Sequence, residues 1–314
     1  MFLDKAEELN IGNILIVGAG CCGCTALSEM VIKAVCEEAD LLSVDSDRQT
    51  LCDRGALNLL QIGEAVTGET STHGNPEIGK AAVEESKDEI TDAIRDYKAV
   101  IIVAGMGGGL GAGAAPAIAH ISRELGIPTL AVVTEPFSFE GEKMKRNAAS
   151  GISRLRKEAD AMSVISGAEI VRRAGDLVPV EEAEEMSQQM ILQIVQGICD
   201  MFCIDDMFCI DGCDAFSVIQ SGKVKSITAG SGRGENKAED AVNGVIRSAE
   251  LVDCDFSTAS HISMFVRGDI SLYEINDIEN RMEMLIGKKP DCITTDGTDE
   301  TMKDEIRLTA LELQ

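Results

Sequence analysis

The sequence predicts a doubly wound α/β domain with a parallel sheet, joined by a long central helix to a smaller α+β domain. Short β-branched strand patterns alternate with helical patterns through residues 1–180, as in parallel sheets with crossover helices. An amphipathic stretch follows, and from residue 216 strand and helix patterns alternate again. We therefore expect an α/β domain over residues 1–180, a central helix and loop over 181–215, and an α+β domain over 216–314.

The chain begins with a strand pattern and a first glycine loop. Residues 13–17 (NILIV) precede residues 18–23 (GAGCCG), a helical pattern follows, and the strand pattern at 41–44 ends at Asp45 and Asp47. Alone, this is the G-x-G-x-x-G fingerprint of a dinucleotide-binding fold, whose later acidic residue holds a ribose hydroxyl. An NAD-dependent dehydrogenase is therefore one hypothesis. No catalytic histidine or lysine constellation accompanies it, because the three histidines are scattered.

A second and richer glycine loop lies at the centre of the α/β region. Residues 99–120 (AVIIVAGMGGGLGAGAAPAIAH) predict a strand, a phosphate-sized loop and a helix, with six glycines among residues 105–113. Glycine allows close backbone approach, so that successive N–H groups can surround an anion at the start of the helix. Six glycines in nine residues cost more chain entropy than a simple turn would justify. The loop therefore predicts a phosphate site.

The remaining elements follow from periodicity. We expect a helix from Pro76 to about Tyr97, a strand at 127–134, and the central helix from Glu181 to Phe202, whose single apolar stripe belongs to the core. In the smaller domain we expect strands at 223–229, 261–266, 292–295 and 306–313, a glycine turn at 230–236, and helices at 237–251 and 272–285.

A tandem repeat, MFCIDD then MFCIDG, follows the central helix and brings several aspartates together. They are Asp205, Asp206, Asp211 and Asp214. In a chain this acidic, solvated loop carboxylates are the ordinary interpretation. A catalytic role is the alternative, because positioned carboxylates act as general acids or bases and contribute about 10² to 10⁴ in rate.

Charge and cysteine content limit the partners and the compartment. With 28 basic and 54 acidic residues the formal charge is −26, which repels nucleic acid and anionic membranes and hinders self-association at low salt. We find no secretion-signal pattern or membrane-length apolar run, so we expect a cytoplasmic protein without direct membrane contact, whose eleven cysteines stay reduced. No cysteine group has two C-x-x-C pairs, so we expect no metal site.

These motifs resemble those of the tubulin/FtsZ family. GMGGGLGAGAAP resembles its signature loop, with Leu110 and Ala112 where hydroxyl residues are usual. GAGCCGCT resembles GxGGxGxN, with Thr25 for asparagine, and SVDSDRQ resembles a strand end with Asp45 for asparagine. Residues 74–79 (GNPEIG) resemble the end of a third loop. Later segments extend the resemblance over nearly the whole chain, which implies an FtsZ/tubulin-like fold and a divergent FtsZ-like protein of a prokaryote, archaea included.

The resemblance also implies a function in cell division or the cytoskeleton. It implies GTP or GDP with Mg²⁺, held by both glycine loops, and head-to-tail filaments of this chain, with a second FtsZ-family protein as a further candidate partner. The implied catalytic residues, Asp211 and Asp214, would enter the pocket of the next subunit and position the attacking water. The implied nucleotide-binding residues are Gly20, Cys21, Cys22, Gly23, Thr25, Gly107, Gly108, Gly109, Leu110, Gly111, Glu140 (ribose) and Gln189 (base edge).

Several positions depart from the family pattern. Residues 69–73 (ETSTH) replace the small residues that approach the γ-phosphate, Met144 replaces an arginine, and Glu185 replaces the aromatic that stacks on guanine. Together these changes predict weak binding, altered base preference or loss of turnover. The alternative hypothesis is therefore a non-hydrolysing structural or regulatory protein with this fold. The sequence stops at Gln314 without the family's adaptor-binding tail, so we expect no membrane tethering by that route.

Overall fold

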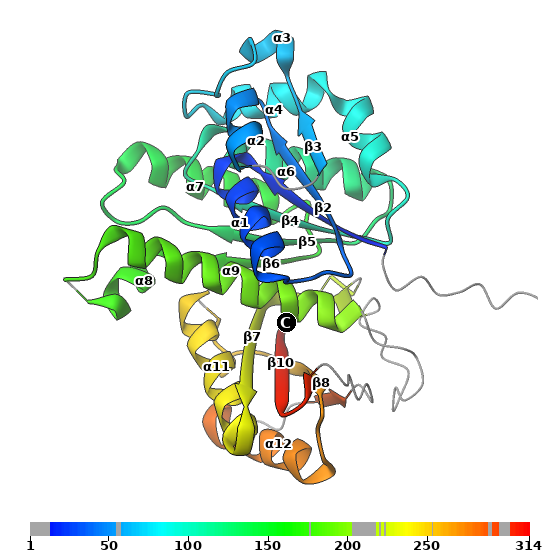
Figure 1. Cartoon of the computed structure of the whole chain (residues 1–314), viewed down its shortest axis with the longest axis vertical. Helices are drawn as coiled ribbons and strands as arrows, with labels where there is room; N and C mark the ends of the chain where they lie inside the picture. Colours follow the sequence, from blue (N-terminus) through cyan, green and yellow to red (C-terminus); the bar gives the residue numbers. More distant parts are fainter. Residues whose placement is uncertain are drawn as a thin grey trace, which may run out of the picture.

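The structure is a computed structural model that describes residues 13–54, 58–175, 177–202, 218–219, 221–222, 224–252, 254–287, 291–294 and 302–314. Two sheets lie on opposite sides of one long helix, α9 (Val180–Phe202). Figure 1 shows the first sheet and its helices above α9 and the second sheet below it. The fold is therefore the α/β domain, central helix and α+β domain that the sequence predicts.

The first sheet has six parallel strands in the order β3-β2-β1-β4-β5-β6. This order reverses direction between β1 and β4, as in doubly wound folds. The strands are β1 (Ile14–Ala19), β2 (Asp40–Asp45), β3 (Asn58–Gln61), β4 (Ala99–Gly105), β5 (Thr129–Thr134) and β6 (Ala161–Ile165).

Helices cover both faces of this sheet. Because successive strand side chains point to opposite faces, Ile16 packs in one core with α1 and α9, while Leu15 and Val17 pack in a second core with α4 to α7. The helices of this domain are α1 (Gly20–Lys33), α2 (Arg48–Arg54), α3 (Glu64–Thr67), α4 (Pro76–Glu85), α5 (Lys87–Ile94), α6 (Gly109–Glu124), α7 (Glu142–Leu155) and α8 (Gly167–Ala174).

The single helix expected from Pro76 to Tyr97 is two helices. Asn75 caps α4 by accepting a hydrogen bond from the Glu77 N–H, and Pro76 occupies the first turn. At Ser86 the backbone leaves the helical region, and the Ser86 hydroxyl accepts a hydrogen bond from the Gly63 N–H at 3.1 Å. The break therefore ties the helix pair to the loop before α3, a long-range contact that helical periodicity does not show.

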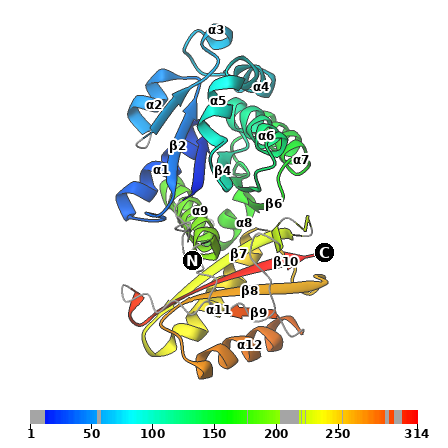
Figure 2. The ribbon, with the colours of Figure 1, turned by 90° about the vertical axis from the view of Figure 1, so that its right-hand side faces the viewer.

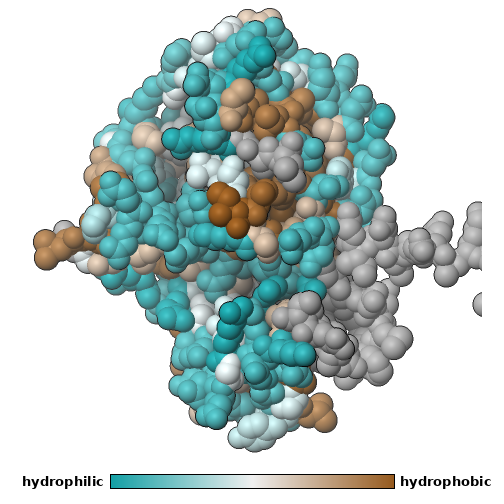
Figure 3. All heavy atoms as spheres, viewed as in Figure 1, coloured by the Kyte–Doolittle hydropathy of each residue, from teal (hydrophilic) through white to brown (hydrophobic). Residues whose placement is uncertain are grey.

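The edge of the first sheet carries exposed apolar side chains. β3 lies at one end of the strand order, and its Leu59 is 49% exposed. On the neighbouring α1, Val31 and Ile32 are also exposed. Figure 3 shows apolar side chains gathered on this face of the first domain, over α1, α2 and β3.

The second sheet has the order β7-β10-β8-β9, with antiparallel pairs except between β8 and β9. Figure 2 shows α11 and α12 below its strands and α9 above them. Its elements are β7 (Val224–Arg233), η2 (Gly234–Asn236), α11 (Lys237–Leu251), β8 (His261–Gly268), α12 (Leu272–Ile286), β9 (Asp291–Thr294) and β10 (Glu305–Leu313).

The glycine turn expected at 230–236 is mostly strand. β7 continues through Gly230 and Gly232, where a Cβ atom would overlap the carbonyl oxygens of Ala241 and Lys237 on α11. These glycines therefore let the helix lie directly against the strand, and the chain turns only after Arg233.

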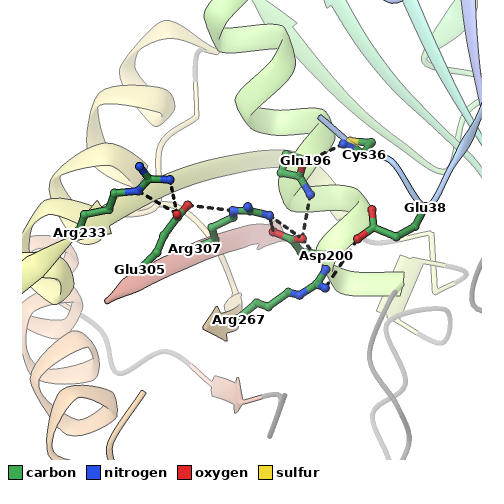
Figure 4. A network of polar contacts seen from close by, with 8 residues as sticks. All are labelled: Cys36, Glu38, Gln196, Asp200, Arg233, Arg267, Glu305 and Arg307. Atoms are coloured by element: carbon green, nitrogen blue, oxygen red, sulfur yellow. Dashed lines mark hydrogen bonds and ion pairs between the residues drawn. The ribbon is translucent and has the colours of Figure 1, made fainter. Parts of the chain in front are cut away.

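A buried ionic cluster joins the two domains at the end of α9. Asp200 is 4% exposed and accepts hydrogen bonds from Arg267 on β8 (2.8 Å) and Arg307 on β10 (3.2 Å). Gln196, one turn earlier, donates to Asp200 and accepts from the Cys36 N–H after α1. Figure 4 shows this cluster between the helix and the strands of the second sheet.

Candidate functional site

A cavity of about 720 Å³ lies at the carboxyl ends of the parallel strands. The loops that follow β1, β2, β4 and β5 all line it, and these strands flank the point where the strand order reverses. Doubly wound folds bind ligands at this position. Both glycine loops therefore belong to one site, whereas the dehydrogenase hypothesis gives the second loop no role.

Two helix N-termini meet at this cavity. α1 begins at Gly20 and α6 at Gly109, and both residues line the cavity. Neither N-cap residue, Ala19 or Gly108, offers a side-chain hydrogen bond to the first turn. The backbone N–H groups of both helices are thus available to a ligand, and both helix dipoles favour an anion there.

The glycines of the second loop have different roles. A Cβ on Gly109 would overlap Thr72 and Asn75, and a Cβ on Gly111 would overlap the carbonyl oxygen of Gly105. A Cβ on Gly108 would meet nothing within 4 Å, and its φ of −77° suits any residue. Gly109 and Gly111 therefore allow close packing of the loops, while Gly108, which lines the cavity, has open space where a Cβ atom would lie.

The third loop closes the cavity opposite the first. Ser71, Thr72, His73 and Gly74 line it, and His73 adopts a left-handed φ of 49°. Lys143 donates to the carbonyl oxygen of His73 at 3.3 Å. The Lys143 ammonium thus holds the third loop, while the neighbouring Met144 lines the cavity.

Asn147 is a further residue that holds two loops together. Its amide donates to the carbonyl oxygens of Gly74 and Gly107, each at 3.1 Å. Sequence reasoning did not find it, although it directly follows the basic residues of α7. Its position directly after Lys145 and Arg146 does not reveal this role, because the two carbonyl groups it binds lie on loops far away in the sequence.

Two titratable groups at the cavity have pKa values above their ordinary ranges. Asp45 ends β2 and is 4% exposed; burial raises its pKa to about 6, although its carboxylate accepts a hydrogen bond from the Asp47 N–H at 2.9 Å. Burial likewise raises the pKa of the Cys22 thiol, whose Sγ lies 3.7 Å from the Thr134 Oγ1. Cys22 is therefore a neutral group of the cavity wall. Within the described ranges we find no group of three His, Cys, Asp or Glu residues arranged to hold a metal ion.

Most of the nucleotide-binding residues expected from the sequence line this cavity. They are Gly20, Cys21, Cys22, Thr25, Gly107, Gly108, Gly109, Leu110, Gly111 and Glu140. Gly23 lies beneath the loop, where a Cβ would overlap the carbonyl oxygen of Val103. Glu140 accepts a hydrogen bond from the Phe137 N–H at 2.7 Å. Asp211 and Asp214 lie outside the described residues.

Gln189, the residue expected at the base edge, lies beside the cavity-lining part of α9. Gln189 is not among the cavity residues; its amide donates to Glu185 on the exposed face of α9. Gln188 lines the cavity instead, together with Glu184 and Glu185. The first turns of α9 have many adjacent polar residues and few apolar ones, so the sequence does not show which of two neighbouring glutamines faces the cavity.

Comparison with known proteins identifies the class. Residues 13–174 match the model of the Tubulin/FtsZ family, GTPase domain, and residues 224–312 match that of the FtsZ family, C-terminal domain. The chain therefore belongs to the tubulin/FtsZ family. Within it, the C-terminal match and the relatives below make it an FtsZ-like protein.

The relatives agree in sequence and in fold. The chain is 34% identical over 307 residues to cell division protein FtsZ 1 of Halobacterium salinarum, covering 97% of this chain and 76% of that protein. It is 31% identical over 300 residues to cell division protein FtsZ of Wigglesworthia glossinidia brevipalpis, covering 95% and 78%. An empty FtsZ dimer of M. jannaschii superposes with a TM-score of 0.82 at 28% identity, covering 96% and 88%.

A more distant structure supports the fold alone. CetZ2 from Haloferax volcanii, solved as a protofilament with GTPγS bound, gives a TM-score of 0.73 at 18% identity, covering 96% of this chain and 92% of that one.

Among the helices described here, none is long and apolar enough to cross a membrane.

Proposed function

We propose that this chain binds GTP with Mg²⁺ in the cavity and assembles head to tail into filaments of a cell-division or cytoskeletal system. The convergence of two uncapped helix N-termini on one cavity supports the phosphate site most directly. The cavity wall also contains more carboxylates than basic side chains. Oxygen ligands suit Mg²⁺, so a cation carried on the phosphates would fit this wall and offset its charge.

Gly108→Ala tests the phosphate site. The added methyl group meets no protein atom, so the thermal unfolding of the nucleotide-free protein should be unchanged. It would occupy the space above the N-terminus of α6, so the affinity for a fluorescent GTP analogue should fall at least about tenfold. As a contrast, Gly111→Ala should destabilise the loop itself, because its Cβ overlaps a backbone oxygen. Unchanged GTP affinity in a folded Gly108→Ala protein would contradict the proposed site.

We further propose that hydrolysis needs a contact between subunits, with Asp211 and Asp214 of one subunit acting on the nucleotide of the next. The FtsZ of M. jannaschii was solved as a dimer, which supports self-association, and a head-to-tail contact between copies would be open and repeat along a filament. Asp211→Asn should bind GTP without hydrolysing it. Gly108→Ala retains the aspartates, but at a GTP concentration well below its raised dissociation constant it should bind little GTP and therefore hydrolyse little.

Mixing the two inactive variants separates a shared site from a site within one subunit. In a random one-to-one mixture, about a quarter of the contacts combine an intact cavity with an intact Asp211, so up to about a quarter of the wild-type rate should return. Phosphate release measures the rate, and sedimentation shows whether both variants enter the polymer. Co-sedimentation without any recovered hydrolysis would exclude the shared site.

A second candidate function is assembly without turnover. It is favoured by the third loop, where the side chains of Ser71, Thr72 and His73 line the cavity in place of small residues. The same assays distinguish assembly with hydrolysis from assembly without it. If the wild-type protein sediments in a nucleotide-dependent way but releases no phosphate, assembly without turnover is supported.

A further inference from the structure

The third loop brings a hydroxyl group and an imidazole together in the wall of the cavity. Ser71 and His73 both line the cavity and are exposed, whereas Thr72 between them is buried. The Oγ atom of Ser71 lies 3.4 Å from the Nδ1 atom of His73 and accepts a hydrogen bond from the His73 backbone N–H, also at 3.4 Å. When the imidazole carries its proton on Nε2, Nδ1 can accept the hydroxyl hydrogen. A hydroxyl group within hydrogen-bonding distance of a base is the arrangement of an activated nucleophile.

The backbone of this pair is anchored on both sides. Before it, the Ser46 hydroxyl group on the loop after β2 donates to the carbonyl oxygen of Thr70 at 3.0 Å. After it, Lys143 on α7 donates to the carbonyl oxygen of His73 at 3.3 Å. These contacts hold the loop in place before a ligand arrives, so less conformational freedom has to be lost when the ligand reacts with it.

The third loop also lies directly against the start of α6. A Cβ atom on Gly109, the first residue of that helix, would overlap the Oγ1 atom of Thr72. The uncapped N–H groups of α6 are those proposed to bind the phosphates of the nucleotide. Because Ser71 and His73 adjoin Thr72 on either side, the pair lies at the phosphate end of the cavity.

We propose that Ser71 accepts the terminal phosphoryl group of bound GTP, with His73 as the base. The Ser71 Oγ atom attacks the γ-phosphorus and forms a bond to it, while the bond from the γ-phosphorus to the oxygen that bridges to the β-phosphate breaks. The hydroxyl proton moves to Nδ1 of His73 and from there to solvent. The products are phosphoserine and GDP. This inference rests on the proposed nucleotide function and adds a second reaction to it.

The reaction takes place within one subunit, in contrast to the proposed hydrolysis at a contact between subunits. Its product is an anion that stays beside the N-terminus of α6, where the helix dipole favours negative charge. A phosphate group on Ser71 also occupies the space of the terminal phosphate of a new GTP molecule. A subunit that has reacted should therefore bind GDP in preference to GTP.

Incubation with GTP labelled in its γ-phosphate, followed by mass spectrometry of peptides, tests the proposal. At saturating GTP with Mg²⁺, the wild-type protein and Asp211→Asn should both incorporate up to one phosphate per chain, on Ser71. Asp211→Asn should react because the step needs no residue of a neighbouring subunit. For the same reason, the rate per chain should not change when the protein is diluted, whereas transfer between chains or by a trace kinase would become slower.

Three variants assign the roles within the loop. Ser71→Ala should abolish incorporation in a protein that still binds a fluorescent GTP analogue. Thr70→Ala is the matched control, because it removes the hydroxyl group of the preceding exposed residue, which does not line the cavity, and it should react at the wild-type rate. His73→Asn removes the base but tolerates the left-handed φ of 49° at this position, and it should slow incorporation at saturating GTP at least about a hundredfold.

Incorporation that persists in Ser71→Ala, or that slows on dilution, overturns the proposal. Equal rates in His73→Asn and the wild type overturn the role of His73 as the base. If GTP displaces the fluorescent analogue from the wild-type protein but no phosphate is incorporated, the phosphate site stands and only the reaction of Ser71 is overturned. If GTP does not bind to the wild-type protein, the proposed function is overturned, and this inference with it.

Discussion

At the scale of single residues, Asp45 shows the free-energy cost of burying a carboxylate in the wall of the cavity proposed to bind phosphate. It is buried at the end of β2, and desolvation raises its pKa to about 6 despite the hydrogen bonds it accepts from the following backbone N–H groups. An ionised Asp45 also repels a phosphate ligand across the cavity. This one side chain therefore affects both stability and ligand affinity, and in the same pH range.

Asp45→Asn should stabilise the protein at pH 7.5. Because the folded-state pKa is raised above the unfolded value, the native state holds the proton more tightly, and stability falls as pH rises from about 4 to about 6. Asparagine removes this loss and keeps the hydrogen bond from the Asp47 N–H. We expect a gain of up to about 2 to 3 kcal/mol at pH 7.5, measured by urea unfolding, and almost none at pH 4. Equal effects at both pH values would contradict the assignment.

At the scale of elements, the sequence was most informative where periodicity alone decides the structure. Residues 237–251 predict α11 and residues 99–103 predict most of the central strand β4, because apolar spacing and β-branched residues act locally. Long-range contacts determine the element boundaries that local periodicity does not predict. At Ser86 the helix ends where the hydroxyl group binds the loop before α3. At Gly230 strand β7 continues, because the missing side chain leaves room for α11.

The residues of the candidate site show the same contrast between local sequence patterns and long-range contacts. The glycine loops were predictable because only glycine allows such close backbone approach. The cavity role of Gln188 rather than Gln189, and the bonds from Asn147 to two loops, depend on helix rotation and on segments far apart in the chain. No local pattern contains that information.

Gly230→Ala tests the close packing of α11 on β7. The new methyl group would overlap the Ala241 carbonyl oxygen, and backbone cannot rotate away as a side chain can. We expect the free energy of unfolding to fall by about 2 to 3 kcal/mol in urea titrations. Ser231→Ala, on the exposed neighbouring residue of the same strand, should change it by less than about 0.5 kcal/mol. Similar values for both variants would show that the helix can move off the strand at little cost.

At the scale of the whole molecule, α9 is the element that both domains share. Its apolar residues complete one core of the first sheet, and Asp200 near its end meets arginines from two strands of the second (Figure 4). Burial raises the pKa of Asp200, while Arg307 and Arg267 oppose that shift. A buried charge of this kind holds its partners in one arrangement, because separating them leaves charges without partners in a dry environment.

Asp200→Asn should therefore weaken the packing of the two domains against each other. With a neutral amide in place of the carboxylate, Arg267 and Arg307 lose their common partner, and we expect the free energy of unfolding to fall by about 2 to 3 kcal/mol. Glu169→Gln is the control, since it breaks a solvent-screened ion pair with Arg172 and should change the free energy of unfolding far less than Asp200→Asn does. Urea unfolding followed by circular dichroism compares the two. A loss no larger than that of the control would mean that apolar packing alone joins the domains.

The edge strand β3, which pairs with β2 alone among the described strands, gives the acidity of the chain a practical consequence. Unpaired strand edges with exposed apolar residues such as Leu59 invite stacking of one chain on another. Mutual repulsion between molecules of charge −26 opposes this at neutral pH, and it vanishes near the isoelectric point of about 4.4. The surplus of carboxylates therefore opposes precipitation at neutral pH, and buffers acidified toward the isoelectric point weaken that repulsion.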